Sequence, residues 1–277
     1  MLGSLIIVFR EVIEAGIIVG IVMAATRLVP GRGFWITAGV AGGVFGACVV
    51  AIFAGAISNS FAGSGQELLN ASVLSVAVVM LMWHNAWMAR HGREMAEDFR
   101  RLGASVTAGE RPLLAVAIVV GVAVLREGSE IVLFLYGIIA GGTTGMDVFV
   151  GGVLGVVAGA AFTWLTYRGL LAIPVRHIFL VTTALISLLA AGLAAQAVNF
   201  FTQAGVVDVM QTPLWDTSWL LSQGSLFGKM LQTLIGYNDQ PTGLQLIAYL
   251  GTLAAMVILM RVARTAPHRV RSPAPAE

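Results

Sequence analysis

Seven long apolar segments constrain the fold of this chain more than any other feature of its sequence. An α-helix needs about 20 apolar residues to cross a hydrocarbon core of about 30 Å. The segments cover residues 2–26, 34–57, 67–89, 113–140, 147–170, 177–201 and 242–262. The 277 residues are 58% hydrophobic and only 11% charged, whereas about 25% of residues are charged in a soluble domain. We therefore predict an all-α membrane protein with seven transmembrane helices.

The arginines between these segments indicate how the chain is oriented. In a seven-helix arrangement, thirteen of them fall on one side of the membrane, and the other side holds a single basic residue, Lys229. Cytoplasmic loops carry an excess of Lys and Arg, so we predict that the N-terminus is outside and the C-terminus is cytoplasmic. The thirteen are Arg27, Arg32, Arg90, Arg93, Arg100, Arg101, Arg111, Arg168, Arg176, Arg261, Arg264, Arg269 and Arg271.

Two segments break the apolar pattern with the same set of charges. Residues 9–18 are FREVIEAGII and residues 125–134 are LREGSEIVLF, so each segment contains the pattern R-E-x-x-E. On a helix, the two glutamates of a motif share one face, and the arginine can reach the second glutamate four residues later. Both motifs lie at a depth where we expect hydrocarbon. Their ionisable residues are Arg10, Glu11, Glu14, Arg126, Glu127 and Glu130.

These buried charges predict a cation site. Each costs about 2.5–3.5 kcal/mol at the centre of a membrane helix, so ionisable residues there are functional by default. Two arginines can neutralise two of the four glutamates, and the other two must be protonated or meet a cation. The only cysteine is Cys48, and we place His84 near the inner end of the third segment, away from the site. Carboxylates without sulfur or imidazole favour hard cations such as Mg, Ca, Mn and Fe(III).

The two motifs belong to a predicted internal repeat. They are 116 residues apart, and AGVAGGVFGA at 38–47 resembles GGVLGVVAGA at 151–160. A unit of three membrane crossings repeated in tandem must be inverted, and inverted repeats with a midplane site are typical of transporters. We therefore divide the chain into a first three-helix repeat with its cytoplasmic loop, a second and inverted repeat, an outer loop, a seventh helix and a cytoplasmic tail. The bounds are 1–111, 112–201, 202–241, 242–262 and 263–277.

Two connecting segments complete this organisation. We predict that the mixed-charge residues 90–111 form a solvated helix end and loop. The outer loop 202–241 contains Trp215 and Trp219 and the apolar spacing of a short amphipathic helix, and it is long enough to cap an entrance or dock a partner. The acidic residues of the outer side make it net negative, which suits the attraction of cations. They are Glu67, Asp147, Asp208, Asp216 and Asp239.

The paired R-E-x-x-E helices in a seven-segment chain resemble the high-affinity iron permeases, both the bacterial EfeU-type and the yeast-type. The resemblance extends to QELLNASVLSVAVVML at 66–81, LLAAGLAA at 188–195 and SLFGKMLQTLIGYNDQP at 225–241. It implies that the six motif residues translocate iron as a substrate, with no permanent cofactor. Glu67 matches the first glutamate of an outer E-x-x-E in this family, which implies that iron meets Glu67 at the entrance before the motif glutamates hold it. The second position of that E-x-x-E is the neutral Asn70.

The resemblance also implies a place and partners for the protein. We expect a bacterial inner membrane and membrane lipid around the helices. The outer partner would be a periplasmic cupredoxin-type protein with a haem peroxidase, or a multicopper oxidase. Two alternatives stay open: a transporter of another divalent cation such as manganese, and a non-transporting subunit that anchors an outer oxidase. We expect no enzyme activity and no nucleic-acid partner, and both Fe(II) and Fe(III) remain candidates for the substrate.

Overall fold

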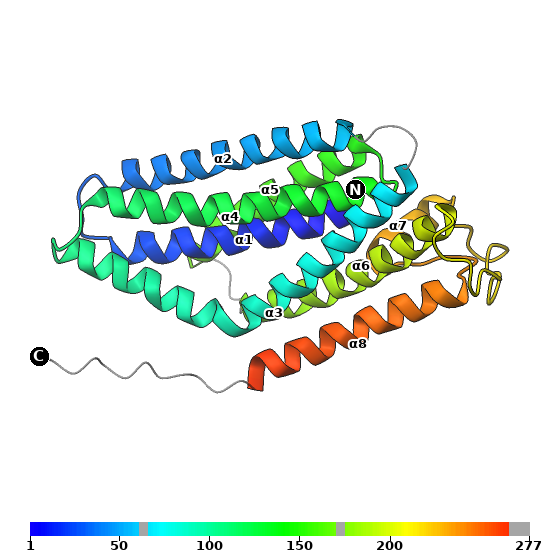
Figure 1. Cartoon of the computed structure of the whole chain (residues 1–277). Helices are drawn as coiled ribbons and strands as arrows, with labels where there is room; N and C mark the ends of the chain where they lie inside the picture. The colour runs from blue at the N-terminus through cyan, green and yellow to red at the C-terminus, as the bar shows by residue number, and fades with distance from the viewer. Residues whose placement is uncertain (61–65, 170–174, 266–277) are drawn as a thin grey trace, which may run out of the picture.

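The computed structural model describes residues 1–60, 66–169 and 175–265, which form eight helices and contain no strand beyond one isolated bridge between Pro213 and Thr242. Figure 1 shows long helices lying side by side, with the short α7 at one end of the bundle. The helices are α1 (Leu2–Ala25), α2 (Arg32–Ser60), α3 (Gln66–Thr107), α4 (Leu113–Ala140), α5 (Gly145–Tyr167), α6 (Val175–Gln203), α7 (Leu226–Ile235) and α8 (Gly243–Thr265).

Seven of these helices coincide with the predicted apolar segments, and all their ends lie within three residues of the prediction except the C-terminal end of α3. Five of them, α2, α3, α5, α6 and α8, are long and apolar enough to cross a membrane. The other two, α1 with 24 residues and α4 with 28, each contain the three charges of an R-E-x-x-E motif. The all-helical architecture is confirmed, and the count of seven membrane crossings stays a prediction.

Glycines bring the motif helices into close contact with α2 and α5. A Cβ on Gly43 of α2 would lie 2.6 Å from the carbonyl oxygen of Gly121 in α4. A Cβ on Gly155 of α5 would lie 2.8 Å from the carbonyl oxygen of Leu5 in α1. Gly121 and Leu5 are 116 residues apart, the same offset that separates the two motifs. Small residues let helix backbones approach in this way, and they do so at matching places in the two halves of the chain.

The same contacts give the direction of each helix. Gly39 faces Ala117 and Gly43 faces Gly121, so α2 and α4 run parallel. Because α2 begins where α1 ends, α1 and α4 run antiparallel. Gly39 contacts Ala117, and Gly151 contacts Met1, which lies 116 residues before Ala117. The packing therefore makes Gly39 and Gly151 equivalent. The alignment of 38–47 with 151–160 made from sequence differs from this by one residue.

The prediction of a solvated helix end and loop at 90–111 is wrong for most of that segment. Helix α3 continues to Thr107 and is 42 residues long, and Figure 1 shows that it changes direction part-way along. Its second half is amphipathic: Leu102 and Val106 are buried against Val22 and Val116, with Phe99 packed beside them. Sequence reasoning ended the helix where the arginines begin, but Arg90, Arg100 and Arg101 lie on its exposed face.

The chain between α6 and α8 forms an ordered segment around α7, the short helix that the sequence predicts there. Ser225 caps α7 by accepting a hydrogen bond from the backbone N–H of Gly228 at 3.0 Å. Hydrogen bonds from Ser218 and Gln240 hold the pKa of the Asp216 carboxyl below its usual range, so this side chain stays negatively charged. Trp219 is 81% exposed. The predicted cytoplasmic tail lies outside the described residues from residue 266 on.

Candidate metal site

The two R-E-x-x-E motifs meet inside the bundle, where α1 and α4 pack against each other. Glu11, Glu14 and Glu127 are buried, with 0%, 3% and 2% of their surface exposed. A carboxylate oxygen of Glu11 lies within 4.8 Å of one from Glu127 and one from Glu130. Four glutamates from segments more than a hundred residues apart in the sequence therefore line one buried space.

Each arginine pairs with the second glutamate of its own motif. Arg10 Nε donates to Glu14 Oε1 at 2.8 Å, and Arg126 Nε donates to Glu130 Oε1 at 3.1 Å. This i, i+4 pairing is the one that the sequence predicts.

The pairing leaves buried carboxylate oxygens without a hydrogen-bond donor. They are both oxygens of Glu11 and the Oε2 atoms of Glu14 and Glu127. Buried polar atoms are normally hydrogen-bonded, and burying a charge without a partner costs far more than burying a paired one. The cluster is therefore suited to take up protons or a cation, and its oxygen donors fit a hard or intermediate metal ion.

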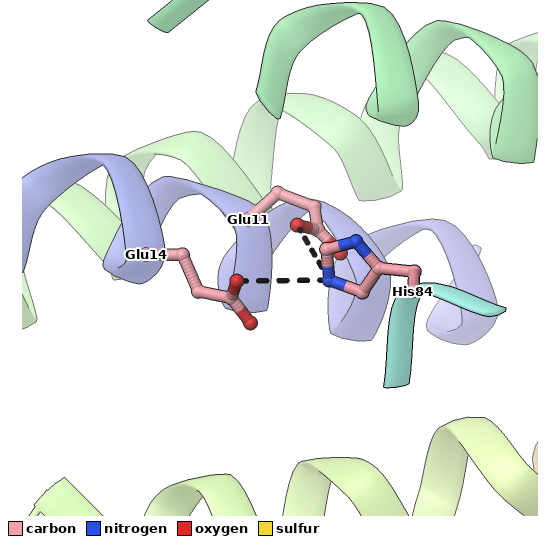
Figure 2. A group of neighbouring side chains, drawn as sticks. All are labelled: Glu11, Glu14 and His84. Atoms are coloured by element: carbon pink, nitrogen blue, oxygen red, sulfur yellow. Dashed lines mark ion pairs between the residues drawn. The ribbon is translucent and has the colours of Figure 1, made fainter. Parts of the chain in front are cut away.

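His84 of α3 also belongs to this cluster, and the prediction that placed it away from the site is wrong. The side chain is only 3% exposed. Its Nε2 atom lies 3.7 Å from Glu11 Oε2 and 3.6 Å from Glu14 Oε2, as Figure 2 shows. Its Nδ1 atom contacts the Glu130 carboxylate. The polar pair His84–Asn85 inside an otherwise apolar stretch is the sequence signal that could have identified it.

Helix α3 supplies a partner for each arginine as well. Asn85 Oδ1 accepts a hydrogen bond from Arg10 Nη1 at 2.5 Å. The guanidinium of Arg126 lies 3.9 Å from the centre of the Trp87 ring, within the range of a cation–π interaction. Three nearby residues of α3 therefore position the charged groups of both motifs.

Two cavities reach the cluster from one end of the bundle, in the part of the chain that the structure describes. A cavity of about 190 Å³ is lined by Glu14 together with Met95 and Phe99 of α3. A second cavity, of about 270 Å³, is lined by Arg126 and Glu127 and by the same two α3 residues. Both lie toward the end of the bundle where the arginine-rich turns are found.

The opposite side of the cluster is closed by apolar side chains. Leu81, Phe134 and Ile186 pack together there, each with 1% or less of its surface exposed. They come from α3, α4 and α6, so the seal joins three helices. Cavities therefore adjoin the cluster on one side, and packed apolar side chains adjoin it on the other.

Glu67 and Asn70 lie apart from the cluster. Glu67 is exposed in the first turn of α3. It precedes His84 by 17 residues, which corresponds to about 25 Å along a helix at 1.5 Å per residue. The structure does not bring Glu67 or Asn70 into the carboxylate cluster, and a role for these two residues at the entrance stays a prediction.

The chain is similar in sequence to known membrane iron transporters over nearly its whole length. Residues 1–273 match the iron permease FTR1 family. A protein of Escherichia coli O6:H1 (strain CFT073) named ferrous iron permease EfeU is 30% identical over 96% of this chain and 99% of its own. A protein of the same name from Yersinia pestis is 29% identical over 94% of this chain and 93% of its own. No solved structure matches the chain.

Proposed function

Because the chain belongs to the iron permease FTR1 family, we propose that this multi-pass membrane protein imports iron through the buried glutamate cluster. The ion would be held by Glu11, Glu14, Glu127 and Glu130. The observation that carries this proposal is the set of buried carboxylate oxygens of Glu11, Glu14 and Glu127 that lack a hydrogen-bond donor. A cation would satisfy them, and the two arginines would keep the net negative charge low enough for the ion to leave again.

We propose that α1 and α4 cross the membrane together with the five apolar helices, which gives seven crossings. An inverted three-plus-three repeat is supported by the matching glycine contacts of α2 with α4 and of α5 with α1. It is also supported by the antiparallel course of α1 and α4. In transporters with such repeats, the substrate site lies near the bilayer midplane at the repeat interface, where the two motifs meet in this chain.

The position of the cavities supports a direction of release. Cytoplasmic loops are rich in arginine, so the two cavities at the arginine-rich end would open to the cytoplasm. The apolar contacts of Leu81, Phe134 and Ile186 would close the outer side in this state. Rocking of one repeat against the other would then open the outer side and close the cavities.

For the transported species we propose Fe(II), because the relatives are named ferrous iron permeases. We place the protein in a bacterial inner membrane, with the outer segment around α7 as the surface for a periplasmic cupredoxin-type protein and haem peroxidase or for a multicopper oxidase. Any oxidation of iron would be carried out by such a partner.

Radioactive iron flux into proteoliposomes tests the proposal. Wild-type protein should carry iron, and Glu14→Gln and Glu130→Gln should each abolish the flux while the protein still inserts into the membrane. Glu110→Gln, a change in an exposed turn, is the matched control and should transport normally. Wild-type flux in both site variants would contradict the proposal.

Fe(II), Fe(III) and Mn(II) should be supplied separately in this assay, with reductant present for Fe(II). Uptake of Fe(II) alone is the expected result. Preferred uptake of manganese would favour the alternative of another divalent cation. No flux of any ion through the purified chain would favour a subunit that only anchors an oxidase.

A further inference from the structure

We propose that His84 is a direct ligand of the transported ion and makes the site prefer iron over harder divalent cations. This proposal rests on the proposed function, since it concerns the same buried cluster. It adds a nitrogen ligand from a third helix to a site that the R-E-x-x-E motifs build from oxygen alone.

The first support is the position of the His84 ring. Its Nε2 atom faces the free Oε2 atoms of Glu11 and Glu14 at 3.7 and 3.6 Å (Figure 2). These separations are too long for hydrogen bonds. Bonds from a first-row metal ion to nitrogen and oxygen are about 2.1 Å, so two ligand atoms around one ion are at most about twice that distance apart. The three atoms can therefore bind one ion between them.

The second support is the contact on the other side of the ring. His84 Nδ1 meets the carboxylate of Glu130, and Phe134 packs against the ring at a centroid distance of 6.3 Å. Histidines that bind metals usually donate their other ring N–H to a carboxylate, which fixes the ring and its tautomer. A proton on Nδ1 leaves the Nε2 lone pair directed at Glu11 and Glu14.

The cluster then contains two overlapping positions for an ion. One is formed by Glu11, Glu14 and His84, and the other by Glu11, Glu127 and Glu130. The first has nitrogen and oxygen ligands, and the second has oxygen ligands only. Because Glu11 belongs to both, we infer that a single ion moves between them and keeps one ligand during the step.

The nitrogen ligand gives the first position its selectivity. Imidazole suits iron and the later first-row metals, whereas sites with only carboxylate and water ligands suit Mg, Ca and Mn. An all-carboxylate cluster attracts any divalent cation by its charge. His84 therefore adds an interaction that iron gains more from than manganese does.

The selectivity test compares His84→Gln with His91→Gln in the proteoliposome assay. His91 is the matched control, because it lies on the same helix and neither cation position includes it. Fe(II) uptake is measured against increasing Mn(II). In wild type and His91→Gln, manganese should compete poorly; in His84→Gln, the discrimination between the two ions should fall by about tenfold or more, the size of effect known for ligand-shell changes at metal sites.

A merely structural role for His84 would lower the uptake of both ions alike and leave their ratio unchanged, and that result would overturn the proposal. The comparison is also separate from the test of the function. If Glu14→Gln and Glu130→Gln abolish flux while His84→Gln keeps the wild-type ratio, the function stands and the role of His84 fails. If the two glutamate variants transport normally, the function itself fails.

A spectroscopic measurement on the wild-type protein does not depend on how any variant folds. Fe(II) bound to the full chain is probed as its nitric oxide adduct by pulsed electron paramagnetic resonance, with and without ¹⁵N-labelled histidine. A directly bound imidazole should give a nitrogen coupling that changes with the label, persists in His91→Gln and is lost in His84→Gln. Bound Fe(II) whose nitrogen coupling does not change with the label in the wild-type protein would overturn the proposal.

Discussion

The arginine of the first R-E-x-x-E motif is buried inside the bundle, whereas the arginine of the second is partly exposed and lines a cavity. The Arg10 side chain is 3% exposed and the Arg126 side chain is 36% exposed. Arg10 is held by Glu14 and by the amide of Asn85, while Arg126 lies on the face of Trp87 and lines the larger cavity. Two copies of one motif therefore have different electrostatic environments, and α3 causes the difference because it gives each arginine a different partner.

The largest effect should come from removing Arg10, and the same change at Arg126 is the comparison. Arg10→Gln leaves Glu14 as a buried charge without its cation, which typically destabilises a protein by about 3–5 kcal/mol. Arg126→Gln should cost less, because it loses a partly exposed pair worth about 1 kcal/mol or less and a cation–π contact worth about 0.5–2 kcal/mol. Thermal unfolding of the purified variants in detergent measures the difference. Equal losses would show that the two motifs are equally buried in the working protein.

Glycine substitutions test the places where the two halves agree. Gly43→Ala and Gly155→Ala should each destabilise the protein by about 1–3 kcal/mol, because the new Cβ meets a backbone carbonyl of the facing helix. Gly42→Ala and Gly152→Ala are matched controls, since a Cβ at either position has nothing within 4 Å. These controls should be neutral or slightly stabilising, since alanine favours the helix. If only one of the substitutions Gly43→Ala and Gly155→Ala is tolerated, the two helix contacts are not equivalent.

Asn85→Leu tests the contact that seals the first motif. It removes the acceptor for Arg10 Nη1, and leaving a buried donor unpaired costs about 1–3 kcal/mol. Stability in detergent should fall by this amount. If the amide only fills space, the similarly sized leucine will leave the unfolding temperature unchanged.

The smallest expected effect belongs to the second motif. Trp87→Leu removes the ring under Arg126, a contact worth about 0.5–2 kcal/mol. Stability should change little, whereas iron uptake should change more, because the freed guanidinium can swing across the cavity that it lines. Uptake and stability that fall in proportion would mean that Trp87 acts only through packing.

The sequence by itself determined the helices and which charges are buried. Apolar length and the i, i+4 spacing are local properties, so the helix ends other than the C-terminal end of α3 and the pairs Arg10–Glu14 and Arg126–Glu130 follow without a structure. The repeat also predicts that the two motifs lie near each other. These inferences need only helix geometry and the cost of charge in an apolar environment.

The tertiary structure alone decided what α3 contributes. Whether His84, Asn85 and Trp87 face lipid or the motif helices depends on the rotation and course of α3, and no local pattern sets these. The continuation of α3 to Thr107 depends on an apolar stripe that becomes stabilising only when other helices cover it. The difference between the two motifs in burial and in arginine partners also arises from contacts between segments far apart in the sequence.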